Sequence, residues 1–265
     1  LLSWVLLLFV FTQDKTNETY RFISVGGFSF QPSELAKGAL ILYLAQFLAR
    51  RQELINDFRR TLQPALGFIG LTCLLIALND LSTALVLFSV CMMVLYIAGA
   101  RFKHLMLLFA VGMVGVTLLF AFAPRAATWR NRVDHYIQQV SNPELGRFDS
   151  QSLQSRIAIA QGGILGAGPG KSVQRHRLPQ SENDFVYAIV AEEYGFLGAV
   201  IVLLLFGTLL MRVMGLITVP PPFGALLVAG LSFLLLIQAL VNMGVAVGLL
   251  PVTGLPLPLV SSGGT

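Results

Sequence analysis

The chain has 265 residues, of which 55% are hydrophobic and only 12% are charged, with a formal net charge of +5. A soluble domain carries about 25% charged residues, so the composition excludes an ordinary soluble enzyme and predicts a membrane protein with several spans. The sequence has no Lys/Arg run interleaved with aromatic residues, which excludes a nucleic-acid-binding protein. The modest basic excess is typical of the loop charges that set membrane topology.

Apolar runs approach the length of about 20 residues that a membrane-crossing helix needs. They cover residues 35–49, 64–78, 83–99, 104–123, 185–211 and 223–250. Residues 1–11 (LLSWVLLLFVF) are interpreted as the end of one more span, because they lack the basic segment and cleavage site of a signal peptide. We therefore expect an all-α, polytopic transmembrane helix bundle that forms one domain, residues 1–265, and is a fragment of a longer bundle.

The first complete span begins at QPSELAK, residues 31–37. Pro32 and Ser33 favour a helix start, and Glu34 lies in the first turn, where the helix dipole favours an acid. Glu34 and Lys37 are three residues apart, so they share a helix face and can form an ion pair. The alternative interpretation is that Lys37, at the outer membrane edge, binds a lipid phosphate.

Lys and Arg in the short loops predict the orientation through the positive-inside rule. Residues 50–63 carry four Arg and residues 100–103 carry two basic groups, whereas residues 79–82 carry none. We therefore expect the two basic loops and the loop with Arg212 in the cytoplasm. The segments expected outside are residues 12–32, 79–82 and a long loop at 124–184.

The loop at 124–184 is far longer than most connections, and loops of this length are usually functional or disordered. In TWRNRVDHYIQQV (128–140) the apolar residues fall on one helical face, and QSLQSRIAIA (151–160) has a similar spacing. We expect short amphipathic helices that lie on the membrane surface. The alternative is that these helices only cover the bundle.

The segment GGILGAGPGKS (162–172) ends like a phosphate-binding P-loop, but the first glycine of that motif falls on Leu165, so an ATPase is excluded. Successive glycines still allow backbone N–H groups to approach an anion, and Lys171, Arg175 and Arg177 follow closely. We expect these cations to bind a diphosphate group. The alternative is a tight turn without a ligand.

The stretch SENDFVYAIVAEEY (181–194) places carboxylates at the entry to an apolar run, where ionisable residues are candidates for function. Asp184 immediately precedes the run, at the junction of the basic loop and the membrane. A carboxylate there is a candidate general base for a hydroxyl nucleophile. Glu192 lies about two turns later on roughly the same helix face, and we expect it to bind substrate. The alternative is that Glu192 binds a partner between helices.

Several stretches, in order and over nearly the whole chain, together resemble the SEDS family of FtsW, RodA and SpoVE proteins. They are QPSELAK (31–37), NDLSTALVLF (79–88), SLQSRIAIAQGGILGAGPGKS (152–172), RLPQSENDFVYAIVAEEYGFLGA (177–199) and NMGVAVGLLPVTGLPLPLVSSGGT (242–265). The resemblance is closer to FtsW than to RodA. It implies ten transmembrane helices, of which about seven are present here.

The resemblance implies a peptidoglycan glycosyltransferase that polymerises lipid II at the outer face of the bacterial cytoplasmic membrane, for septal wall synthesis in cell division. It implies that Asp184, in the NDF motif, is the catalytic residue. It also implies substrate-binding roles for Glu34, Lys37 and the loop arginine Arg132, and a class B penicillin-binding protein as partner. The chain departs from the family pattern at Phe22, where many members have Trp, and at NDLSTA, where PDLGTA is commoner.

Three other functions stay open at this point: an elongation-type polymerase for cell shape, a lipid II flippase and a division scaffold without catalysis. A flippase needs charges along a path through the bilayer, whereas the acids and bases here gather near the outer side. A scaffold gives no reason to keep carboxylates at Asp184 and Glu192. A divalent cation, Mg²⁺ or Mn²⁺, is a further expectation, because carboxylate oxygens near a diphosphate suit such ions.

Overall fold

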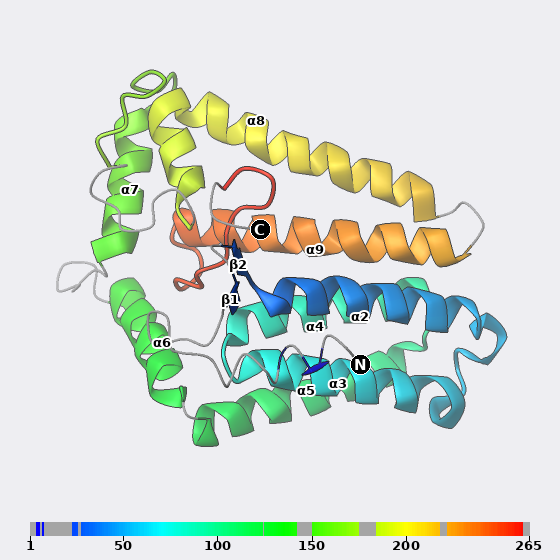
Figure 1. Cartoon of the computed structure of the whole chain (residues 1–265). Coiled ribbons are helices and arrows are strands. Elements are labelled where there is room, and N and C mark those ends of the chain that lie inside the picture. Colours follow the sequence, from blue (N-terminus) through cyan, green and yellow to red (C-terminus); the bar gives the residue numbers. More distant parts are fainter. Residues whose placement is uncertain are drawn as a thin grey trace. The chain divides into compact units, whose positions relative to one another are not determined.

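The computed structural model describes residues 31–123, 125–141, 150–174, 184–217 and 222–261, three helical residues near the N-terminus and the backbone of one hairpin. Its elements in chain order (Figure 1) are β1 (Ile23–Val25), β2 (Phe28–Phe30), α2 (Pro32–Ala49), η1 (Gln52–Leu54), η2 (Phe58–Leu62), α3 (Gln63–Ala77), α4 (Leu81–Ile97), α5 (Phe102–Phe122), α6 (Ala126–Ser141), α7 (Ser150–Gly162), α8 (Val186–Ile217) and α9 (Pro222–Ala246). The strands β1 and β2 pair antiparallel, with Ile23 opposite Phe30. Apart from this hairpin the described part of the chain is helical, as predicted.

Each of the six predicted spans that the structure describes contains a helix. Among the residues that the structure describes, four helical stretches are long and apolar enough to cross a membrane: Phe58–Ala77, Phe102–Phe122, Val186–Leu216 and Pro222–Ala246. The helix α4 is a shorter apolar helix of 17 residues, and α2 with its 18 residues rises about 27 Å. The protein is therefore a multi-pass membrane protein. The further span predicted from residues 1–11 falls largely outside the described residues.

The chain forms two compact units, each of which is described by itself. The first consists of Leu1–Arg125 and Met211–Leu234 with the last two residues, and the second of Ala126–Leu210 and Leu235–Gly263. The second unit thus contains most of the long loop, the beginning of α8 and the end of α9. The expectation of a single domain with 124–184 as a loop inside it stays a prediction.

In the first unit α3 packs on α4, and α2 packs on both. Ile41, Leu44 and Leu48 are fully buried, and their spacing of three and four residues places them on one face of α2. Gly230 of α9 approaches this face so closely that a Cβ atom there would press on the side chain of Ile41. The buried face of α2 therefore follows from the helical period of its apolar residues.

Two contacts in the first unit join loops that the topology prediction places on the same side of the membrane. Between the two basic loops, Asn56 Oδ1 accepts a 3.1 Å hydrogen bond from the N–H of Arg101. Between two segments expected outside, the Arg125 guanidinium donates to the carbonyl of Asn79. The helices of this unit therefore alternate in direction, as the distribution of basic residues predicts.

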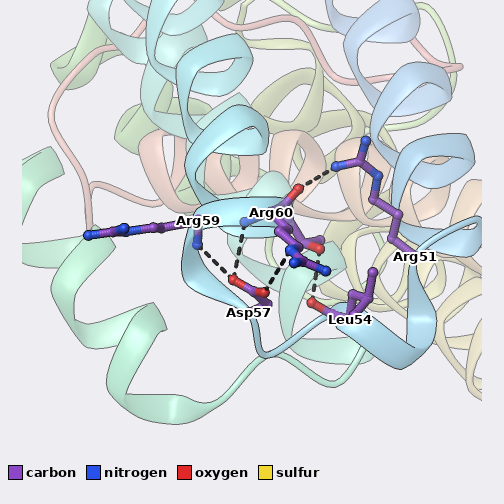
Figure 2. A network of polar contacts seen from close by, with 6 residues as sticks. Arg51, Leu54, Asp57, Arg59 and Arg60 are labelled. Atoms are coloured by element: carbon purple, nitrogen blue, oxygen red, sulfur yellow. Dashed lines mark hydrogen bonds and ion pairs between the residues drawn. The ribbon is translucent and has the colours of Figure 1, made fainter.

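The Arg-rich loop between α2 and α3 is folded around Asp57 (Figure 2). Asp57 caps the π-helix η2 by accepting hydrogen bonds of 3.1 and 3.2 Å from the N–H groups of Arg59 and Arg60. Its carboxylate also lies 3.5 Å from Arg60 Nε, and Arg51 donates to the Arg60 carbonyl. The charges that set the topology are thus carried by an ordered turn.

Candidate functional site

The first predicted site residues, Glu34 and Lys37, lie in the first unit and contact each other. Lys37 is fully buried, and its Nζ lies 2.8 Å from Glu34 Oε1. Pro32 occupies the first turn of α2, so the helix starts where the sequence predicts and brings the two side chains together one turn apart. The predicted ion pair is therefore present, and a phosphate on Lys37 stays a prediction.

The helix α8 is broken at Gly195, whose φ of 68° and ψ of −165° are not helical. Figure 1 shows its two parts meeting at an angle. A break leaves main-chain donors and acceptors without helical partners, and the glycine-rich turn after α7 supplies them. The carbonyls of Glu192 and Glu193 accept hydrogen bonds of 2.9 and 3.0 Å from the N–H groups of Ala167 and Gly168.

The same turn also accepts hydrogen bonds from α8. The N–H groups of Phe196 and Leu197 donate to the carbonyls of Gly163 and Ile164, at 2.9 and 3.3 Å. Glycine is needed for this close approach, because a Cβ atom on Gly166 would collide with the carbonyl oxygen of Glu193. The N–H groups at 167 and 168 already donate to carbonyls of the chain, which favours the tight turn over a backbone anion site.

Glu192 is only 2% exposed, and groups of its own chain surround its carboxylate. Oε2 accepts a hydrogen bond from the Ser172 hydroxyl, and Oε1 accepts from the N–H groups of Val173 and Gln174, at 2.9 and 3.4 Å. The carboxylate therefore fixes residues 172–174 against α8. A direct contact of Glu192 with substrate stays a prediction.

Asp184 is half-buried on the turn that precedes α8. Its main-chain carbonyl accepts a 2.8 Å hydrogen bond from Asn242 Nδ2, which also donates to the Leu255 carbonyl at 2.7 Å. The next residue, Phe185, is 1% exposed and packs in an apolar cluster with Val245. The main chain at Asp184 is thus held from both sides, by an amide on α9 and by a buried aromatic ring.

Side chains of α6 and α7 converge on the last residue of α9 and on the segment that follows it, where main-chain carbonyls lack helical donors. Arg132 Nη1 and the Tyr136 hydroxyl donate to the carbonyls of Val252 and Leu249, at 3.3 and 2.6 Å. From α7, the Ser155 hydroxyl and Arg156 Nη2 donate to the carbonyls of Ala246 and Gly248, at 2.8 and 3.4 Å. The end of α9 therefore joins both loop helices to the element that holds Asp184.

The cations predicted to bind substrate in the long loop lie on different elements. Arg132 lies on α6 in the same unit as Asp184, with an exposed side chain. Lys171 is exposed at the end of the glycine-rich turn, where its N–H donates to the Gly168 carbonyl at 3.2 Å. Arg175 and Arg177 fall outside the described residues.

Reasoning from the sequence missed Asn242, Tyr136, Ser155 and Arg156. Asn242 is 1% exposed within the apolar run predicted at 223–250, and its Oδ1 is buried without a partner. A polar side chain inside such a run is itself a signal of function. An amide carries no charge, so the presence of ionisable groups in a span does not point to Asn242.

No three His, Cys, Asp or Glu side chains gather within the part of the chain that the structure describes. The carboxylate of Glu192 already accepts hydrogen bonds from residues 172–174. The predicted Mg²⁺ or Mn²⁺ therefore stays a prediction, with oxygen ligands from substrate needed beside any protein carboxylate.

The whole chain, residues 1–265, matches the model of the FtsW/RodA/SpoVE family, described as cell cycle proteins. The chain belongs to this family. The resemblance deduced from the sequence motifs is therefore confirmed, with FtsW and SpoVE proteins among the curated relatives.

Two curated relatives of this family member illustrate the match. Stage V sporulation protein E of Bacillus subtilis (strain 168) is 38% identical over 252 residues, which cover 94% of this chain and 68% of that protein. A probable peptidoglycan glycosyltransferase FtsW of Geobacter metallireducens is 37% identical over 250 residues, which cover 92% of this chain and 65% of that protein. The chain thus spans about two thirds of the length of these relatives.

Solved structures of the family have the same fold. A chain of a peptidoglycan synthase complex, whose structure concerns the coordination of polymerization and crosslinking, aligns with a TM-score of 0.69 and 31% identity over 98% of this chain and 73% of that one. The rod shape determining protein RodA of Thermus thermophilus aligns with a TM-score of 0.63 and 29% identity over 98% of this chain and 69% of that one. The predicted SEDS fold is therefore confirmed.

Proposed function

We propose that the protein is a peptidoglycan glycosyltransferase that extends glycan strands from lipid II during cell division. Its family membership and its relatives named peptidoglycan glycosyltransferase FtsW support the enzyme class and the division role. The structural observation that carries the proposal is the position of Asp184. Its main chain is fixed by Asn242 near the end of α9, and Arg132 of α6 donates to the carbonyl of Val252 in the segment that follows α9.

The reaction is a substitution at a sugar carbon. The oxygen of an acceptor hydroxyl bonds to the anomeric carbon of the donor, the bond from that carbon to the diphosphate oxygen breaks, and the hydroxyl proton must leave. Asp184 accepts this proton as general base, a role that is typically worth about 10²–10⁴-fold in rate. A half-buried carboxylate on a fixed main chain suits this task because it needs little reorganisation.

The diphosphate gains negative charge as it leaves and needs cations to stabilise it. A guanidinium has five N–H donors, and the described hydrogen bond of Arg132 uses one of them. Lys171 is exposed on the turn that docks on α8, and Arg175 and Arg177 follow it in sequence. These four cations bind the diphosphate, and Glu192 positions the segment that leads to the last two.

Lys37 binds a phosphate or headgroup of the lipid-linked substrate, with Glu34 as the group that holds it when no phosphate is bound. Support comes from the charge and burial of Lys37, whose only described ion pair is with a carboxylate that is one-third exposed. A divalent cation, Mg²⁺ or Mn²⁺, would assist by neutralising the diphosphate through oxygen ligands.

The protein acts in the bacterial cytoplasmic membrane beside a class B penicillin-binding transpeptidase. The similarity to a chain of a peptidoglycan synthase complex supports this partner, because that complex concerns both polymerization and crosslinking. An elongation-type role is the second candidate, and the structural similarity to RodA favours it. The FtsW relatives favour division.

The test is polymer formation from labelled lipid II by the purified full-length protein together with its transpeptidase. Glycan chains resolved on a gel, and digestible by a muramidase, are the expected result. Movement of lipid II across a vesicle membrane without polymer would instead identify a flippase. Neither activity from a folded complex would identify a scaffold.

A further inference from the structure

Two large apolar side chains are exposed on the glycine-rich turn after α7. Ile164 is 71% exposed and Leu165 is 77% exposed. The turn that carries them is held against α8 by the four main-chain hydrogen bonds described above, so the two side chains form a fixed apolar surface. Exposing this apolar surface to water would cost free energy.

The geometry of α8 indicates the depth of this surface. After the break at Gly195, residues 196–217 form 22 residues of helix, which rise about 33 Å. This length matches the hydrocarbon thickness of about 30 Å, so the membrane-crossing part of α8 begins near Phe196. The exposed side chains Leu197, Ile201 and Leu204 mark its lipid-facing side.

The hydrogen bonds to α8 place the turn at this same level. Phe196 and Leu197 donate to the carbonyls of Gly163 and Ile164, so Ile164 and Leu165 lie where the hydrocarbon layer begins. The neighbouring Phe196 is also exposed, and the apolar surface is therefore continuous with the lipid-facing side of α8. Lys171, exposed at the other end of the turn, has the charge and reach to contact phospholipid headgroups.

We propose that this turn is a membrane anchor, in which Ile164 and Leu165 insert into the adjoining leaflet of the bilayer. The anchor holds the glycine-rich turn at the membrane surface, and Glu192 extends this restraint to residues 172–174. The occupant of the surface is lipid, because the surface continues the side of α8 that faces lipid. The inference concerns membrane contact and does not depend on the proposed enzymatic reaction.

Fluorophore depth tests the anchor in the full-length protein. Cys73→Ala and Cys91→Ala remove the two thiols of this chain, and any cysteine elsewhere in the full-length protein is replaced as well. The environment-sensitive dye NBD is then attached at Leu165→Cys in nanodiscs of phosphatidylethanolamine and phosphatidylglycerol. Ile164→Cys gives a second probe in case one label disturbs the turn. Pro169→Cys is the control on the same turn outside the anchor, and Leu204→Cys is the reference inside the membrane.

The anchor predicts blue-shifted emission at positions 164 and 165, with quenching by lipids that carry a doxyl group just below the headgroup. Aqueous cobalt should quench position 169 and leave 164 and 165 largely unaffected. Cobalt quenching at 164 and 165 equal to that at 169 would overturn the proposal. Shielding of 164 and 165 that arises only when the transpeptidase is added would also overturn it, because the surface would then be a protein interface.

Discussion

The starts of α2 and α8 both hold carboxylates near the membrane, and they do so in different ways. At α2, Glu34 pairs with Lys37 one helical turn away. At α8, Glu192 is bound by residues 172–174, about twenty positions earlier in the chain, and the main chain of Asp184 is held by Asn242. The first arrangement is local and the second depends on long-range contacts. Substitutions near α8 should therefore disturb the loop and the chemistry together, whereas those in α2 should act locally.

The largest effect is expected from Asp184→Asn. The amide keeps the shape of the side chain but cannot accept the hydroxyl proton, so the rate of lipid II polymerisation should fall by about 10²–10⁴-fold. The variant should still fold and insert, because the hydrogen bond from Asn242 is accepted by the main-chain carbonyl of Asp184, which the substitution keeps. Asp134→Asn, an exposed carboxylate on α6, is the control. A polymerisation rate near that of the parent would refute the assignment of Asp184 as base.

The docking of the glycine-rich turn on α8 is tested by Gly166→Ala. Both Gly166 and Gly170 have positive φ, 84° and 73°, so alanine costs about 1–2 kcal/mol of backbone strain at either position. At Gly166 the added Cβ also collides with the Glu193 carbonyl, whereas at Gly170 it meets open space. Steric overpacking should add about 1–3 kcal/mol. Gly166→Ala should therefore lower the free energy of unfolding more than Gly170→Ala, and equal effects would contradict the docking.

Glu192→Gln tests the carboxylate that binds the loop. Hydrogen bonds to a charged group contribute about 1.5–3 kcal/mol, and the amide replaces one acceptor oxygen by a donor that opposes Ser172 or the N–H groups. The free energy of unfolding in detergent should fall by about this amount, with a smaller loss of polymerisation than in Asp184→Asn. Glu193→Gln is the matched control, since the carbonyl of Glu193 makes its described contact with the turn. The interpretation fails if the two variants are equally stable.

The helices and the alternation of their direction across the membrane could be predicted from the sequence, because both depend on local composition. Apolar runs of about 20 residues fix the spans, and arginines in short loops predict their sides. The contact between Asn56 and Arg101, which links the two basic loops, agrees with that prediction. The position of the break in α8 could not be predicted, because the run from 185 to 211 contains glycines at 195, 198 and 207. The break occurs at Gly195 because the turn at 163–168 forms hydrogen bonds with the main chain on both sides of it.

The candidate site was predictable only where its chemistry is local. The spacing of Glu34 and Lys37 indicated their pair, and the NDF motif indicated Asp184 through a family resemblance. The convergence of Arg132, Tyr136 and Arg156 on the end of α9 joins residues about a hundred positions apart. No helical period or motif spacing encodes such a contact.

The smallest effect is expected from the pair in α2. Glu34 is one-third exposed, so water can solvate it when Lys37 is replaced, and Lys37→Met should lower the free energy of unfolding by less than about 1 kcal/mol. Lys37→Met keeps most of the buried stem and removes the charge. If the ammonium binds a substrate phosphate, the lipid II concentration for half-maximal rate should rise about tenfold, equivalent to about 1.4 kcal/mol.

The double variant Glu34→Ala, Lys37→Met distinguishes the phosphate from the ion pair. A lysine that only neutralises Glu34 becomes dispensable once Glu34 is gone, so the double variant would then regain the parent's dependence on lipid II. A lysine that binds phosphate stays necessary, so the tenfold shift should persist in the double variant. Glu34→Ala alone serves as control and should retain strong lipid II use, because it frees the ammonium for phosphate. If the double variant regains the parent's dependence on lipid II, then Lys37 serves only to neutralise Glu34 and does not bind a substrate phosphate.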